Sequence, residues 1–154
     1  IREVLKIGKG RVIQEGKKVA ILNFGTRLNE CKKASELLSQ KGINVTIIDA
    51  RFAKPLDKKL IMEIATTHEV LVSIEEGSIG GFGSHVMQFL SDKGIFDKGL
   101  KFRSMVLPDL FLDQDTPKKM YEKAGLDSLS IANKIEETLN SNIILVKNRN
   151  KIKN

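Results

Sequence analysis

Apolar residues follow two different periods along the chain, and these periods predict strands that alternate with helices. Short runs rich in β-branched residues are typical of buried strands, and they occur at residues 18–24, 45–48, 70–74 and 102–107. Between these runs, apolar residues recur every three or four positions, which is typical of amphipathic helices. The pattern therefore predicts an α/β fold, a three-layer α/β/α sandwich around a mostly parallel sheet of about five strands.

The residues that flank the apolar segments predict where the helices begin and end. Side chains of Ser, Thr and Asp cap the first turn of a helix, proline favours its first position, and glycine ends it. We expect helix starts at Asp57, at Ser84, at Thr116 before Pro117, and at Ser128 or Ser130, with stops at Gly42 and Gly125.

Residues 11–14 form a further strand candidate before the first buried run. Glu15 and Gly16 separate the two segments as a turn, and this short spacing predicts a β-hairpin that supplies the one antiparallel strand. Residues 1–10 are expected to be a linker from missing upstream domains, because the chain also lacks an initiator Met and is expected to be a piece of a longer protein. Residues 11–140 are the predicted domain.

The last residues, 141–154, are expected to be a basic and poorly ordered tail, although residues 143–146 are apolar enough to pack. Lys147, Arg149, Lys151 and Lys153 supply four charges of the formal net charge of +7. The other basic residues are scattered, and the chain has no Trp and one Tyr on which bases could stack. We therefore expect a solvated basic surface and no nucleic-acid partner.

The composition is that of an ordinary globular protein, with 154 residues, 41% hydrophobic and 29% charged. No apolar run approaches the roughly 20 residues of a membrane span, and the N-terminus has no apolar stretch of the kind found in a secretory signal. We therefore expect no membrane partner. The single cysteine, Cys31, lies on the apolar face of a predicted helix, so a buried structural thiol is favoured over a nucleophile.

The most distinctive stretch is a glycine-rich loop that follows the strand at residues 70–74. Glu75 and Glu76 come first, and the loop glycines are Gly77, Gly80, Gly81 and Gly83. A strand, a glycine-rich loop and a helix form the layout with which open α/β sheets build a working surface. The loop does not match the dinucleotide pattern G-x-G-x-x-G, and it lacks the Lys-Ser/Thr ending of a P-loop. A weaker anion site at the helix start, using Ser84 and nearby amides, stays open, but a packing or interface loop is favoured.

Neither the glutamates nor the histidines predict a complete catalytic set. Because Glu75 and Glu76 are adjacent, their side chains point to opposite faces of a strand, and we expect one carboxylate to accept hydrogen bonds from the loop amides. His68 and His85 lack partners at metal-ligand spacing. A proton-transfer pair between His85 and one of the glutamates is an alternative, but a hydrogen-bonded structural histidine is the more frequent case.

Several strings, taken together, resemble one enzyme family. They are IGKGRVIQEGKKVAILNFGT, DARFAKPLD, VSIEEGSIGGFGSHV, LPDLFLDQD and YEKAGLD. In this order they resemble the C-terminal domain of the 1-deoxy-D-xylulose-5-phosphate synthases, which are transketolase-like thiamine diphosphate enzymes. The match runs from about residue 7 to residue 139, and the loop resembles the plant-type and related bacterial branch. The D-x-R-F-x-K-P-L-D and L-P-D-x-F elements distinguish this family from transketolase and pyruvate dehydrogenase.

The resemblance implies a domain without catalytic residues of its own. In this family the first two domains bind thiamine diphosphate, Mg²⁺, pyruvate and glyceraldehyde 3-phosphate, and the third carries a mixed five-stranded sheet and helps to build a homodimer. No cofactor or metal is therefore expected on this chain, whose partners would be the upstream domains and a second subunit. The default location is cytoplasmic, and the plant-type loop leaves a plastid open.

We expect the contact surface to lie where the parallel strands end. It comprises the residues Asp49, Arg51, Glu75, Glu76, Gly77, Gly80, Gly81, Gly83, Ser84, His85, Pro108 and Asp109. The main alternative is a free-standing anion- or nucleotide-binding module that uses residues 77–84, which predicts saturable binding of a phosphate ligand. A nucleic-acid binder is the second alternative, and it predicts retention on DNA that falls steeply with salt.

Overall fold

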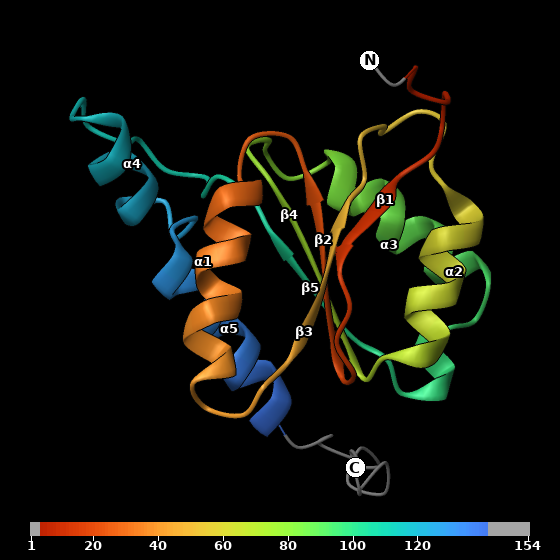
Figure 1. Cartoon of the computed structure of the whole chain (residues 1–154). Coiled ribbons are helices and arrows are strands. Elements are labelled where there is room, and N and C mark those ends of the chain that lie inside the picture. Colours follow the sequence, from red (N-terminus) through yellow and green to blue (C-terminus); the bar gives the residue numbers. More distant parts are fainter. Residues whose placement is uncertain (1–3, 142–154) are drawn as a thin grey trace, which may run out of the picture.

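The computed structural model describes residues 4–141, in which one five-stranded sheet separates two layers of helices (Figure 1). The strands are β1 (Arg11–Gln14), β2 (Val19–Phe24), β3 (Val45–Asp49), β4 (Val70–Glu75) and β5 (Lys101–Met105). The helices are α1 (Leu28–Ser39), α2 (Lys58–Thr67), α3 (Phe82–Asp92), a short 3₁₀ turn (Phe96–Lys98), α4 (Pro117–Lys123) and α5 (Ser128–Asn140). This is the predicted α/β/α sandwich.

The sheet order is β1-β3-β2-β4-β5, with β1 antiparallel to β3 and the other pairs parallel. The predicted hairpin between β1 and β2 is therefore wrong, although the one antiparallel strand is where it was expected. Residues 15–18 instead cross beneath the start of β3, where the Lys17 N–H donates to the Asn44 carbonyl over 3.2 Å. Gly16 passes so close to the backbone of β3 that a Cβ atom would collide with Val45. The glycine marks a strand crossover and not a hairpin turn.

Alternate residues of the buried strands supply the two halves of the core. Val19 and Ile21 of β2 face α1 and α5, where they pack with Leu38 and Ile131 among others. Their neighbours along β2, Ala20 and Leu22, face α2 and α3. This alternation follows from the period of two in a strand, and burial on both faces explains why the central strands are continuously apolar.

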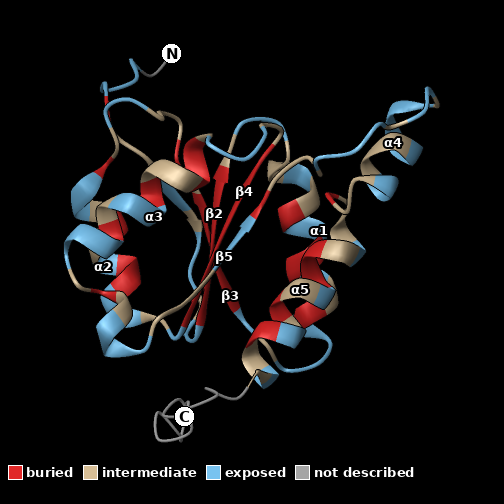
Figure 2. Cartoon of the chain, turned by 180° about the vertical axis from the view of Figure 1, so that it is seen from behind, coloured by how far each residue is buried: buried red, intermediate tan, exposed pale blue. Residues whose placement is uncertain are grey.

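Helix α4 lies at the margin of this two-sided core, with only its partly buried Tyr121 packed against the α1 and α5 side. It has no buried residue, and it projects beyond the layer of α1 and α5 at the edge where the parallel strands end (Figures 1 and 2). The Thr116-Pro117 start is confirmed, since Thr116 is the residue before the helix and Pro117 its first residue. The position of α4 places its polar face and Tyr121 beside the loops that were predicted to form a contact surface.

Candidate functional site

The glycine-rich loop is closed by a carboxylate of the chain itself. Glu75, the last residue of β4, is only 5% exposed and turns back toward the start of α3. Its Oε1 accepts the Phe82 N–H over 3.0 Å, and its Oε2 accepts the Gly83 N–H over 2.6 Å. A negative charge at a helix N-terminus is stabilised by the free amides and by the helix dipole. The prediction that one glutamate accepts hydrogen bonds from the loop amides is confirmed.

The glycines make room for that carboxylate. A Cβ atom at Gly77 or at Gly81 would collide with Glu75 Oε1. Gly83 is packed against the hydroxyls of Ser73 and Ser104, and Gly80 has a positive φ of 98°. The loop is therefore shaped around a residue of its own strand rather than around an open cavity.

The predicted cap at Ser84 is wrong. The helix begins earlier, at Phe82, with Gly81 as the preceding residue, so Ser84 lies within the first turn. Its Oγ accepts the Gly80 N–H over 3.1 Å, which ties the loop to the helix. The capping group comes instead from Glu75, seven residues before the helix starts. An anion approaching these amides would meet the Glu75 carboxylate already bound to two of them.

Glu76 points away from Glu75, as the alternation of a strand predicts. Its Oε1 lies 2.8 Å from an Nη of Arg27, and the Arg27 guanidinium lies 3.5 Å from the centre of the Tyr121 ring. Burial opposes ionisation of Glu76, but the neighbouring Thr26 and Tyr121 hydroxyls and the Arg27 guanidinium outweigh it, so the pKa of Glu76 lies below its usual 4.5. This cluster joins α1 and α4 to the end of β4.

The exit of β3 is closed by a second carboxylate. Asp57, which precedes α2, accepts the Leu60 N–H over 3.2 Å and is thereby confirmed as the predicted cap. It also accepts hydrogen bonds from the Lys9 ammonium and the Gly10 N–H, each over 3.2 Å. Residues 9 and 10 are thus attached to the same turn. The division of the chain into a linker, a domain and a tail stays a prediction, and residues 142–154 lie outside the described part.

Asp49 and Arg51 lie at the end of β3, where Asp49 contacts both β1 and the backbone of Arg51. Asp49 Oδ2 lies 3.2 Å from an Nη of Arg11, and its Oδ1 accepts the Arg51 N–H over 3.3 Å. Arg51 has a positive φ of 59°, and its guanidinium is largely covered. Both residues therefore shape the turn, and their predicted role in contacts with other domains stays a prediction.

The two histidines occupy different settings. His68 lies at the end of α2, where Nε2 is 2.8 Å from Thr46 Oγ1 and Nδ1 is 3.0 Å from the Ile64 carbonyl oxygen. His68 is therefore a hydrogen-bonded structural histidine. His85 lies in the first turn of α3, and the carboxylates of Glu75 and Glu76 are held by the loop amides and by Arg27 rather than by its ring.

The loop after β5 lies beside the glycine loop. The Leu107 N–H donates to the Gly77 carbonyl over 2.9 Å, which brings Pro108 and Asp109 to the edge predicted for them. Three large apolar side chains of these two loops are open to solvent: Ile79 is 76% exposed, Leu110 61% and Phe111 98%. Sequence reasoning missed these three residues. For Leu110 and Phe111 the available signal was an apolar run between Pro108-Asp109 and Asp113 that has neither strand nor helix periodicity, and for Ile79 it was a lone apolar residue among the loop glycines.

A small apolar cavity of about 340 Å³ lies between this loop and α4. It is lined by Glu76, Leu107, Leu112, Pro117, Met120 and Tyr121.

We call residues 49–57, 75–85 and 106–112 together the contact surface, because all three segments follow the ends of parallel strands and therefore share one edge of the sheet.

The described residues offer no metal site, and their cysteine is buried. Within 4–141, no group of three or more His, Cys, Asp or Glu side chains is placed to hold a metal ion, and no helix is long and apolar enough to cross a membrane. Cys31 is buried against α5, and burial raises the pKa of its thiol to about 12. The prediction of a structural thiol is confirmed.

Comparison with known proteins gives the family. The model of the family described as "Transketolase, C-terminal domain" matches residues 8–131. The chain belongs to this family. It resembles a solved structure described as "Split gene transketolase, inactive beta4 tetramer", with 29% sequence identity, a TM-score of 0.79, and coverage of 88% of this chain and 43% of that one.

A second solved structure shows the same fold at lower similarity. Transketolase from Campylobacter jejuni subsp. jejuni NCTC 11168 is 13% identical, with a TM-score of 0.61 and coverage of 84% of this chain and 18% of that one. The present chain thus spans less than half the length of either protein. The predicted fold class is confirmed. The comparisons give the transketolase C-terminal domain family, and the resemblance to one enzyme within it, the synthase, stays a prediction.

Proposed function

We propose that this chain is the C-terminal assembly domain of a 1-deoxy-D-xylulose-5-phosphate synthase. Such an enzyme joins pyruvate to glyceraldehyde 3-phosphate with loss of CO₂, in the formation of isoprenoid precursors. Membership of the transketolase C-terminal domain family supports the thiamine diphosphate class. The motifs DARFAKPLD and LPDLFLDQD favour the synthase over transketolase within that class.

The main observation in support of the assembly role is that a side chain of the protein itself occupies the glycine loop. The amides at the start of α3 are bound by the buried Glu75, while apolar side chains of the neighbouring loops, Ile79 and Phe111, stand in solvent. A loop that satisfies its own amides and exposes apolar side chains is suited to contact with another protein surface. We propose that upstream domains and a second subunit cover it.

The same proposal locates the cofactor elsewhere. Thiamine diphosphate and Mg²⁺ would be held by the upstream domains, and this chain would contribute no catalytic residue. The enzyme would act as a homodimer in the cytoplasm or in a plastid. The solved relative described as a β4 tetramer is consistent with association through a domain of this type.

The decisive experiment compares the full-length parent enzyme with this chain alone. Turnover of pyruvate and glyceraldehyde 3-phosphate is measured with thiamine diphosphate and Mg²⁺. We expect an active parent and a silent chain. Activity in the isolated chain would contradict the assembly role, and an inactive but folded parent would contradict the synthase assignment.

A matched pair of variants then tests the contact surface in the parent enzyme. Phe111→Asp places a charge on the contact surface, whereas Leu129→Asp makes a similar change on α5 at a side chain that is 59% exposed. We expect only Phe111→Asp to shift the dimer toward monomer in size-exclusion chromatography and to lower turnover about tenfold or more. If the two variants have the same dimer content and the same turnover, the contact surface has no part in assembly.

A further inference from the structure

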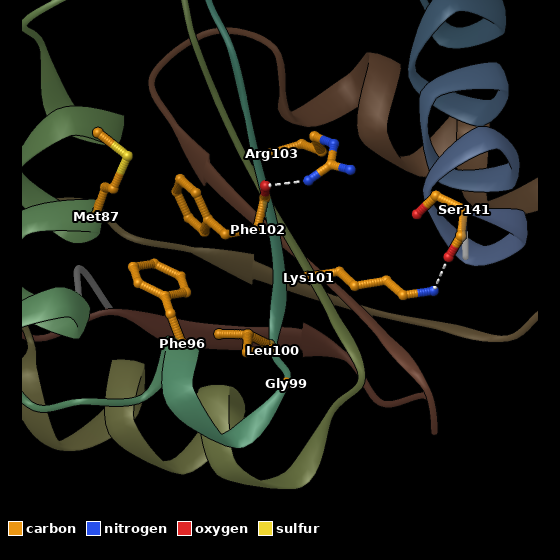
Figure 3. Close-up of a pocket in the computed structure, with 8 residues that line it drawn as sticks. All are labelled: Met87, Phe96, Gly99, Leu100, Lys101, Phe102, Arg103 and Ser141. Atoms are coloured by element: carbon orange, nitrogen blue, oxygen red, sulfur yellow. Dashed lines mark hydrogen bonds between the residues drawn. The ribbon is translucent and has the colours of Figure 1, made fainter. Parts of the chain in front are cut away.

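The open side of β5 carries a hollow that no part of the proposed function uses. The hollow measures about 480 Å³ and is lined by Met87, Phe96, Gly99, Leu100, Lys101, Phe102, Arg103 and Ser141 (Figure 3). It lies across the edge strand: in the view, Met87 and the two phenylalanines are on one side of β5, and Lys101, Arg103 and Ser141 are on the other. Within residues 4–141, β5 has a strand neighbour only on the β4 side.

The α3 side of the hollow is apolar and incompletely covered. Phe96 and Phe102 meet edge to face with their ring centres 6.0 Å apart, and Met87 of α3 is 47% exposed. An aromatic pair beside a flexible thioether can accept apolar side chains of varied shape. The hollow is therefore suited to a short apolar segment.

The other side of the hollow fixes the point where the chain leaves α5. The Lys101 ammonium donates to the carbonyl oxygens of Thr138, Leu139 and Ser141 over 3.3, 3.2 and 2.7 Å. A cation at the C-terminus of a helix satisfies carbonyls that lack partners within the helix. As a result, Ser141 is held on the wall of the hollow, and the next residue starts from there.

The edge of β5 is also protected against pairing. The Arg103 guanidinium donates to the outward-facing carbonyl of Phe102 over 2.8 Å. A charged side chain on an edge strand discourages the addition of another strand. A segment that enters the hollow would therefore pack through its side chains and would not extend the sheet.

We propose that residues 143–146 of the same chain, Ile-Ile-Leu-Val, cross the edge of β5 and pack into this hollow. Only residue 142 separates this apolar run from Ser141, and the basic, Asn-rich end of the chain follows it. Five extended residues reach roughly 17 Å, which suffices to pass from one side of an edge strand to the other. Attachment at the wall gives the segment an effective concentration of about millimolar order, an advantage over any separate partner.

A spin-label experiment on the 154-residue chain tests the placement. Ser91→Cys puts a nitroxide one helical turn beyond Met87, and Lys59→Cys puts the same label on the exposed side of α2 as the control. The buried Cys31, with its pKa raised to about 12, is not expected to react. We expect the label at 91 to broaden the amide signals of residues 143–146 strongly, with little effect from the label at 59.

Two results would overturn the proposal. Equal broadening by both labels would mean that the segment has no preference for the hollow. The second result comes from a mixture of two proteins, one that carries the nitroxide but no isotope and one that is isotopically enriched but carries no nitroxide. Broadening of the enriched protein's signals in this mixture would mean that the segment enters a second copy of the chain.

A matched pair of double variants gives an independent readout. Ile144→Asp with Leu145→Asp, and Asn148→Asp with Asn150→Asp, each add two negative charges to the same tail. We expect only the first pair to lower the Tm, by about 3–8 °C, because docking of the segment would bury the two apolar side chains that this pair replaces. Equal shifts for the two pairs would show a general charge effect and contradict docking of residues 143–146.

Discussion

The loops that follow β3 and β4 solve the same problem in different ways. Each must satisfy the free amides at the start of the next helix, and each does so with a carboxylate. After β3 the carboxylate is Asp57, directly before α2. After β4 it is Glu75, which lies on the strand itself and reaches back across the glycine loop to α3.

The difference lies in how far the solution extends along the chain. Asp57 is a local cap, and its carboxylate also accepts hydrogen bonds from Lys9 and Gly10. Glu75 needs glycine at positions 77 and 81, because a Cβ atom at either position would collide with its Oε1. The comparison shows that a glycine-rich loop before a helix does not by itself indicate a ligand site. The chain's own carboxylate can occupy the place of the anion.

Removal of the long-range cap should have the largest effect. Glu75→Ala leaves the buried amides of Phe82 and Gly83 without an acceptor, and we expect a loss of about 3 kcal/mol in the free energy of unfolding. The measurement is the urea midpoint at constant m-value. A loss smaller than that of Asp57→Ala would reverse the comparison.

Filling the space beside Glu75 should have a similar but smaller effect. Gly81→Ala places a methyl group against Glu75 Oε1, so the carboxylate must move and its hydrogen bonds weaken. We expect a loss of about 2 kcal/mol by urea unfolding. The control is the same Gly81→Ala substitution in the Glu75→Ala variant, where Oε1 is absent, so it reports any backbone effect without the collision. Equal losses would show that the collision has no part in the effect.

The local cap should contribute less. Asp57→Ala removes the acceptor for the Leu60 N–H, and we expect a loss of about 1 kcal/mol. Asp57→Asn keeps a side-chain acceptor but loses the ion pair with Lys9, so it should cost less than the alanine variant. If the two substitutions cost the same, the cap contributes nothing beyond the charge.

The stabilisation that Asp57 provides depends on pH with a definite sign. Burial opposes ionisation of Asp57, but hydrogen bonds from Leu60, Lys9 and Gly10 outweigh it and lower its pKa below the usual 3.8. The stabilisation from the ionised group is therefore complete above about pH 5 and lost as the pH falls through 3.8 and below. We expect the stability difference between the wild-type protein and Asp57→Asn to shrink over that range. A constant difference from pH 7 to pH 3 would contradict this.

The smallest effect is expected at Ser84, the residue that the sequence pattern favoured as a cap. Its Oγ accepts only the exposed Gly80 N–H, so Ser84→Ala should cost about 0.5 kcal/mol or less. A loss near that of Glu75→Ala would restore Ser84 as the capping residue. The same unfolding assay applies, with Ser91→Ala near the end of α3 as the control.

The sequence by itself determined the elements, the fold class and the local cap. Continuous apolar runs identified β2, β3 and β4 because both faces of a central strand are buried, and the period of 3.6 identified the helices because only one face of each packs on the sheet. Asp57 was predictable because a helix cap is a contact between residues three apart. The prediction that one glutamate binds the loop amides also followed from the sequence.

Only the tertiary structure decided which strand β1 pairs with and which residue caps α3. Neighbouring segments suggest a hairpin, but β2 is enclosed by β3 and β4, so β1 cannot pair with β2 and adds to the edge of β3 instead. Ser84 is close to the start of α3 in sequence, yet Glu75 is the residue whose side chain reaches the free amides of that helix. The exposure of Ile79 and Phe111 likewise depends on where the loops lie. Local patterns specify contacts between near neighbours, whereas packing of distant segments chooses among the partners that remain.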